Sequence, residues 1–176
     1  IKDYRGKLVL PGMVDLHLHA PQYAYRGTKM DLPLLDWLNI NTFPEEAKYE
    51  DASYAKAAYT NFVEDLKESP TTRAVIFATL HKEATLELMA LLEESGLSTM
   101  VGKVNMDRNS PDYLTEHSAE ESLESTKAWL REIPKTYRHC RPILTPRFTP
   151  TCSDSLLEGL GRLMAEEGPP VPPFRE

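Results

Sequence analysis

Residues 10–20 read Leu10-Pro11-Gly12-Met13-Val14-Asp15-Leu16-His17-Leu18-His19-Ala20, a short apolar segment that carries two histidines two positions apart. Successive side chains of a strand point to opposite faces, so we expect His17 and His19 to share one face and the neighbouring leucines the other. Two imidazoles that converge at the end of a strand supply half of a binding site for a first-row transition metal. The alternative is a pair of polar residues on a solvent-facing edge. The Pro-Gly turn before the strand and its aliphatic opposite face favour the metal half-site.

The composition indicates one globular domain that stays in the cytoplasm. The chain has 176 residues, of which 41% are hydrophobic and 27% are charged. Its net charge of −7 argues against binding to nucleic acid or to an anionic membrane surface, and no apolar run approaches the length of a membrane span. Two cysteines, Cys140 and Cys152, are too few for a disulfide framework and favour a reducing compartment.

Beyond residue 50, apolar runs alternate with amphipathic segments. We expect strands over 73–80, 100–104 and 142–145, separated by helices of 3.6-residue periodicity. The expected helix boundaries are a cap at Asp51, a stop at Gly96, and capping boxes at Ser118/Glu121 and Ser155/Glu158. Residues 21–50 are expected to form a long loop, which is a candidate for contacting substrate.

This alternation predicts an α/β fold with a parallel sheet. Two architectures remain open on the pattern alone: a doubly wound sheet, or half of a (βα)8 barrel. In both, functional side chains lie at the carboxyl ends of the strands, where the sequence places His17, His19, Gln22, His81, Asn105, Asp107, Arg147 and Phe148.

Some of these side chains suit a flat heterocycle. Gln22 can donate and accept hydrogen bonds, and Arg147 donates in a planar fork, so together they match carbonyl and ring-nitrogen edges. Phe148 and Trp37 could flank such a ring, although Trp37 could equally be a packing anchor. Lys103 is either a ligand contact or a member of a buried ion pair.

Seven segments together resemble the guanine deaminases of the amidohydrolase superfamily. They are 11–20, 19–23, 32–38, 42–46, 77–81, 101–107 and 145–148. The resemblance extends from about Leu8 to about Val171. It implies the first half of a zinc-bearing (βα)8 TIM-type barrel, ending at about the fifth strand. Residues 1–10 would then end a small flanking β domain, 11–171 would form the incomplete catalytic barrel, and 172–176 would be a non-matching tail.

The resemblance also implies a site and an activity. His17 and His19 match two ligands of one zinc ion per full-length subunit, and Gln22, Arg147 and Phe148 match residues that hold the purine. We count His19 and Trp37 as further substrate contacts. The implied reaction is the hydrolysis of guanine to xanthine and ammonia in purine catabolism, by a cytoplasmic enzyme whose full-length form is a homodimer.

One part of the family pattern is absent. A third zinc histidine and a proton-shuttling glutamate are expected in a Q-S-H-[LI]-S-E motif, but Val171 is followed by Pro172-Pro173-Phe174-Arg175-Glu176. We therefore assign no catalytic acid and expect the sequence to be incomplete at both ends. Two alternatives stay open: an inactive remnant, or an amidohydrolase acting on another amino-heterocycle. Gln22 together with Arg147 and Phe148 favours guanine.

Overall fold

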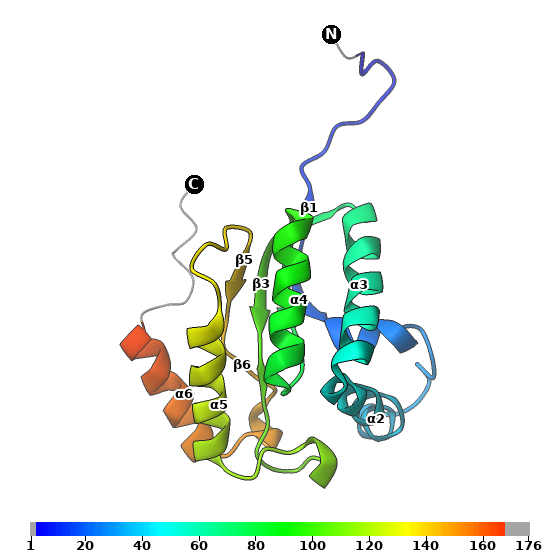
Figure 1. Ribbon diagram of the computed structural model, residues 1–176. Coiled ribbons are helices and arrows are strands. Elements are labelled where there is room, and N and C mark those ends of the chain that lie inside the picture. The colour runs from blue at the N-terminus through cyan, green and yellow to red at the C-terminus, as the bar shows by residue number, and fades with distance from the viewer. Residues whose placement is uncertain (1–2, 168–176) are drawn as a thin grey trace.

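The computed structural model describes residues 3–167 and contains a parallel sheet of four strands (Figure 1). The strands lie in the order β1-β2-β3-β5 and comprise β1 (Met13–His19), β2 (Thr71–Phe77), β3 (Ser98–Gly102) and β5 (Cys140–Pro142). A second parallel pair joins β4 (Val104–Asn105) to β6 (Thr145–Pro146). The predicted tail and the expected fifth barrel strand lie outside the described residues.

Four long helices alternate with these strands, and their ends follow local sequence signals. They are α3 (Ala52–Glu68), α4 (Lys82–Ser95), α5 (Ala119–Glu132) and α6 (Asp154–Glu167). The Asp51 carboxylate accepts hydrogen bonds from two backbone N–H groups at the start of α3. Gly96 ends α4 with φ +75°, a conformation in which glycine has no Cβ to clash. Ser118 caps α5 through the N–H of Glu121, which is one half of the predicted capping box, whereas the Glu121 carboxylate accepts the N–H of His117 rather than that of Ser118.

The main core lies between the sheet and the helices on one of its faces, with α3 and α4 in front in Figure 1. It joins Ile76 of β2 and Val101 of β3 to Tyr59, Leu88 and Trp129 of α3, α4 and α5. The long strands follow one another across the sheet in sequence order, whereas a doubly wound sheet reverses its order at a switch point. The arrangement therefore agrees with the winding of a (βα) barrel.

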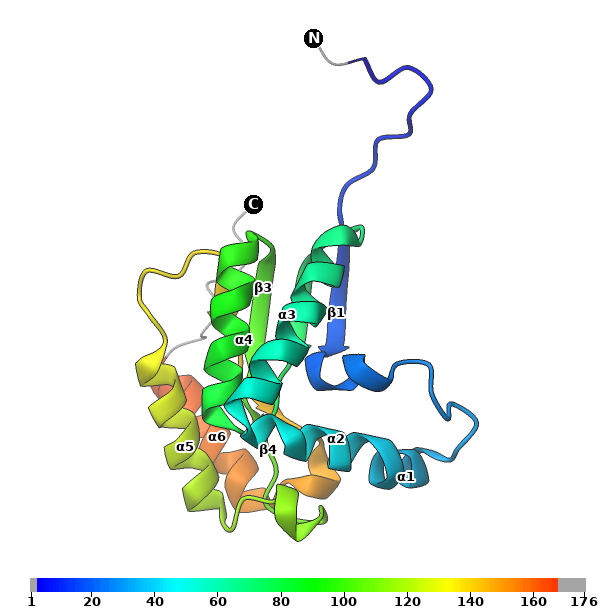
Figure 2. The ribbon, with the colours of Figure 1, turned by 45° about the vertical axis from the view of Figure 1, so that its right-hand side comes forward.

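The expectation that residues 21–50 form a loop is wrong. The segment folds into five short helical pieces: η1 (Ala20–Tyr25), α1 (Leu34–Trp37), η2 (Leu38–Thr42), α2 (Phe43–Ala47) and η3 (Lys48–Glu50). The last four follow one another without a break over residues 34–50, and their winding changes from α to π, back to α and then to 3-10, so their apolar residues do not keep one 3.6-residue period in the sequence. Figure 2 shows α1 and α2 beyond the end of the sheet toward which the β1 arrow points.

Several expected boundaries also move. The strand expected over 73–80 spans 71–77, and the strand expected over 100–104 is divided into β3 and β4. The strand expected over 142–145 is split into β5 and β6, because the chain leaves the main sheet between them to pair with β4. Helix α6 begins two positions earlier than expected, since Ser153 rather than Ser155 accepts the N–H of Leu156. Residues 3–12 contain no helix or strand, and their assignment to a flanking β domain stays a prediction. Within residues 3–167 no helix is both long and apolar enough to cross a membrane.

We expect this 176-residue chain to self-associate through β1. Among the described residues β1 is an edge strand, and its Met13, Val14 and Leu16 are exposed, Leu16 to 70%. Exposed apolar edges template strand pairing between molecules, and a lysine on the edge opposes it. Leu16→Lys should therefore lower the mass found by light scattering at a fixed concentration, whereas Asn61→Lys on the exposed face of α3 should not. Equal masses for both variants would contradict the role of the edge.

Candidate functional site

His17 and His19 lie at the carboxyl end of β1 and point to one side, as the two-residue spacing predicts. Their Nε2 atoms are 3.2 Å apart. The Asp15 carboxylate accepts the N–H of His17 at 3.0 Å and orders the backbone before the pair. Phe77, opposite His19 in the β1–β2 register, packs on both imidazoles at ring-centroid distances of 5.0 and 4.7 Å. The β1–β2 register, which is shifted between Asp15 and Leu18, thus places Phe77 against both imidazoles.

The environment of His19 keeps its imidazole neutral. Burial is the main cause and lowers the pKa of His19 to about 3, with smaller contributions from the positive charge of Arg147 and from His17. A neutral imidazole carries the free lone pair that a metal ligand needs. The geometry and the electrostatics of this residue thus both suit a metal ligand.

A cavity of about 690 Å³ opens beside the histidine pair. Its lining includes every substrate and metal residue expected from the sequence, namely His17, His19, Gln22, Trp37, Arg147 and Phe148. These residues come from β1, η1, α1 and the segment after β6, so the fold brings together positions up to 131 residues apart in the chain. The cavity is the place where a substrate would meet the histidine pair.

Arg147 reaches the cavity from the end of β6. Its backbone N–H donates to the carbonyl of Asn105 at 3.1 Å, which continues the β4–β6 pairing. Its guanidinium lies 2.5 Å from the carboxylate of Glu46 in α2, and only 4% of the side chain is exposed. Phe148, the next residue, is 37% exposed and presents an aromatic face to the cavity.

Trp37 is a packing anchor, and its role as a substrate contact stays a prediction. Its indole N–H donates to the carbonyl of Thr28 at 3.1 Å, and its ring centroid lies 5.4 Å from that of Tyr25, so it anchors the segment before α1. The same ring also lines the cavity. An indole held in this way offers a rigid flat surface on which a planar ligand can pack.

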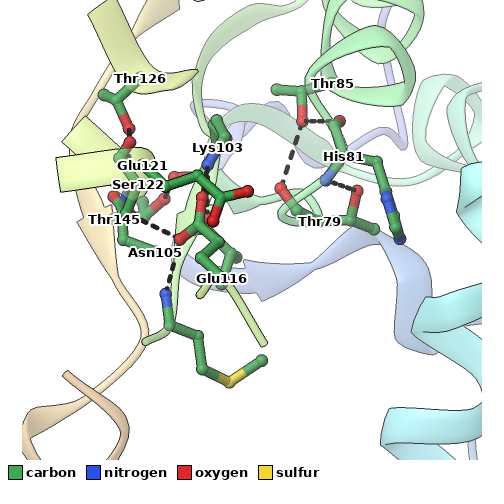
Figure 3. Close-up of polar contacts among 12 residues, drawn as sticks. Thr79, His81, Thr85, Lys103, Asn105, Glu116, Glu121, Ser122, Thr126 and Thr145 are labelled. Carbon is green, nitrogen blue, oxygen red and sulfur yellow. Dashed lines mark hydrogen bonds and ion pairs between the residues drawn. The ribbon is translucent and has the colours of Figure 1, made fainter. Parts of the chain in front are cut away.

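Lys103 and Asn105 belong to a buried network away from the cavity (Figure 3). The Lys103 ammonium pairs with Glu116 at 2.6 Å, which decides in favour of the buried ion pair. Glu116 also accepts from Ser122 and from the N–H of Met106, and the Asn105 amide donates to Ser122. Neither Lys103 nor Asn105 lines the cavity, so both contribute to the stability of the fold rather than to ligand contacts.

Asp107 and His81 are likewise not brought into the cavity. The Asp107 carboxylate accepts the N–H of Ser153 at 2.6 Å and holds the segment before α6. His81 occupies the cap position before α4. Burial lowers the pKa of His81, although the nearby Glu50 opposes the shift.

Residue-by-residue reasoning missed two side chains that shape the site. Glu46 pairs with Arg147 across 101 positions of sequence, and Phe77 packs on the histidines. Both lie inside segments that carry the family resemblance, 42–46 and 77–81. The position of Glu46 and Phe77 in these segments was the only sequence signal for their role, because neither spacing nor periodicity indicates which residues they contact.

The histidine pair fits one side of a tetrahedral zinc site. Zn–N bonds of about 2.0–2.1 Å at tetrahedral angles place two nitrogens about 3.3 Å apart, close to the 3.2 Å between the Nε2 atoms. Within the described residues, no group of three His, Cys, Asp or Glu side chains converges on such a point. The described residues thus offer two imidazole nitrogens at a spacing that a tetrahedral metal accepts.

Comparison with known proteins identifies the family. The model of the amidohydrolase family matches residues 8–171. Guanine deaminase from Dictyostelium discoideum is 41% identical over 166 residues, and guanine deaminase from Escherichia coli K12 is 40% identical over 166 residues. Each alignment covers 94% of this chain but 37% of the relative, so the chain spans little more than a third of the curated proteins it matches.

A solved structure agrees in three dimensions. Guanine deaminase from C. acetobutylicum, with guanine bound in its active site, superposes with a TM-score of 0.85 at 49% sequence identity. The match covers 89% of this chain and 37% of that one. The α/β fold is therefore part of the barrel of such an enzyme, and the chain belongs to the amidohydrolase family.

Proposed function

We propose that the protein to which these residues belong hydrolyses guanine to xanthine and ammonia. The observation that carries the proposal is the cavity that gathers the histidine pair with Gln22, Arg147 and Phe148. The C. acetobutylicum enzyme, similar over 89% of this chain, holds guanine in its active site. We further propose that the full-length protein is a homodimer, that it is cytoplasmic, and that its reaction belongs to purine catabolism.

His17 and His19 would hold the metal, and zinc suits imidazole nitrogens at their spacing. Bound zinc would lower the pKa of a water molecule toward neutrality and so supply a nucleophile. Phe77 contributes by restricting both imidazole rings through its packing contacts. The low pKa of His19 keeps protons from competing with the metal at neutral pH.

Gln22 and Arg147 would orient the purine. Arg147 has only donors, so it would face a carbonyl oxygen or an unprotonated ring nitrogen of guanine. Gln22 can both accept and donate, which suits an edge where an N–H lies beside an acceptor. Phe148 and Trp37 would pack on the ring and exclude water. In the reaction, the oxygen of water bonds to the ring carbon that carries the amino group, and that group leaves as ammonia.

A chimera tests the proposal. The segment of E. coli guanine deaminase that matches this chain, which is 40% identical to it, is replaced by the present sequence. We expect the chimera to form xanthine from guanine, and Arg147→Met in it to lower kcat/KM for guanine at least tenfold. A folded, zinc-loaded chimera that deaminates another amino-heterocycle but not guanine would contradict the proposed substrate.

A further inference from the structure

The pair formed by Glu46 and Arg147 is the most enclosed contact at the cavity. The Arg147 Nη1 and Glu46 Oε2 atoms lie 2.5 Å apart, and the two side chains are 4% and 1% exposed. Arg147 lines the cavity whereas Glu46 does not. Glu46 can therefore influence a ligand in the cavity through Arg147 but not by lining the cavity itself.

The same short helix holds the arginine from a second direction. The guanidinium carbon of Arg147 lies 5.6 Å from the ring centroid of Phe43, within the range of a cation–π contact. Phe43 and Glu46 are three residues apart in α2, so their side chains share one face of that helix. Helix α2 thus contacts the guanidinium twice, through the Glu46 carboxylate and through the Phe43 ring.

We propose that Glu46 is a positioning residue that fixes the Arg147 guanidinium with its remaining N–H donors toward the cavity. This inference rests on the proposed function, because it takes guanine as the ligand that Arg147 receives. An arginine side chain has several rotatable bonds, and ordering it on ligand binding costs free energy. A partner that orders it beforehand removes that cost, and a bonded carboxylate also aims a planar donor fork.

A purely structural role is the competing explanation, since the pair also ties α2 to the segment after β6. The two explanations differ in what they predict for binding. If Glu46 only stabilises the fold, its replacement lowers the unfolding midpoint but leaves the guanine affinity of the folded chain unchanged. If Glu46 positions Arg147, its replacement weakens binding only while Arg147 is present.

The experiment is a double-mutant cycle on this chain, with guanine affinity measured by titration calorimetry. Arg147→Met should weaken guanine binding about ten- to hundredfold, as expected for losing a charge-assisted hydrogen bond. Glu46→Gln, which keeps the shape but removes the charge, should weaken it about tenfold, and Glu46→Asp should weaken it less. In the Arg147→Met background, Glu46→Gln should change the affinity by less than about twofold.

The neighbouring carboxylate provides a matched control. Glu45 bonds to Tyr54 and pairs with Lys48 at 2.6 Å, without a contact to Arg147 among the described residues. Glu45→Gln should therefore leave guanine affinity at the wild-type value. Equal affinities for wild type and Glu46→Gln, or the same loss with and without Arg147, would overturn the positioning role.

A second measurement does not depend on guanine. The Arg147 Nη–H resonances, identified by their absence in Arg147→Lys, should include one that exchanges slowly with solvent in wild type and quickly in Glu46→Gln or Glu46→Asp. Slow exchange in a folded Glu46 variant would overturn the inference even if no purine binds. Failure of wild type to bind guanine, with the exchange result as expected, would instead count against the proposed function.

Discussion

Replacing Lys103 by methionine is expected to lower the free energy of unfolding by about 3–5 kcal/mol, because the change leaves a buried carboxylate without its cation. The Lys103 side chain is fully buried, and its ammonium pairs with Glu116 at 2.6 Å. Burial lowers the pKa of Lys103, and the carboxylate of Glu116 opposes that shift. Urea unfolding followed by circular dichroism, at a concentration where the chain is monomeric, measures the loss.

A matched surface pair is the control. Lys127 and Glu124 lie 2.8 Å apart on the exposed face of α5, and Lys127→Met should cost no more than about 0.5 kcal/mol. Adding Glu116→Gln to Lys103→Met should recover part of the stability, since no unpaired charge then remains. A loss below about 1 kcal/mol for Lys103→Met would contradict the geometry of the network in Figure 3.

Trp129→Ala is expected to destabilise the chain by a similar amount, about 3–5 kcal/mol. Trp129 is fully buried in the core shared by α5, α4 and the sheet, so its removal leaves a large cavity. Trp129→Phe should cost less than about 1.5 kcal/mol, because it retains most of the apolar contact and deletes an indole N–H that has no hydrogen-bond partner among the described residues.

The same unfolding measurement distinguishes core from surface. Tyr113 is an aromatic residue of the exposed segment before α5, and Tyr113→Ala should change stability by no more than about 0.5 kcal/mol. If Trp129→Ala and Tyr113→Ala cost the same, the helices would not pack on the sheet as described.

Local patterns were sufficient to predict the alternating elements and the histidine pair. The two-residue period of β1 places His17 and His19 on one side whatever the rest of the chain does. The caps at Asp51 and Ser118 are equally local, because each side chain bonds to N–H groups two or three residues away.

Contacts between distant segments could not be predicted in the same way. Glu46 contacts Arg147 only because the fold brings α2 and the end of β6 together, and no spacing in the sequence indicates this contact. The prediction of a loop over residues 21–50 was wrong for another reason. The helical pieces there are stabilised by burial of Leu38, Phe43 and Tyr49, and the sequence shows no helical period of its own. Gln22, Arg147 and Phe148 were singled out by their chemistry at the strand ends, and the family resemblance then associated them with a purine.

The central claim is that the cavity between the histidine pair and Arg147 receives guanine. The most direct test maps the backbone amide shifts of the isotope-labelled chain while guanine is added, with adenine as the comparison. We predict that guanine shifts the signals of Gln22, Trp37 and Phe148 together with the Arg147 side chain, and that adenine shifts them less. Guanine shifts that fall elsewhere, or none in a solution saturated with guanine, would contradict the claim.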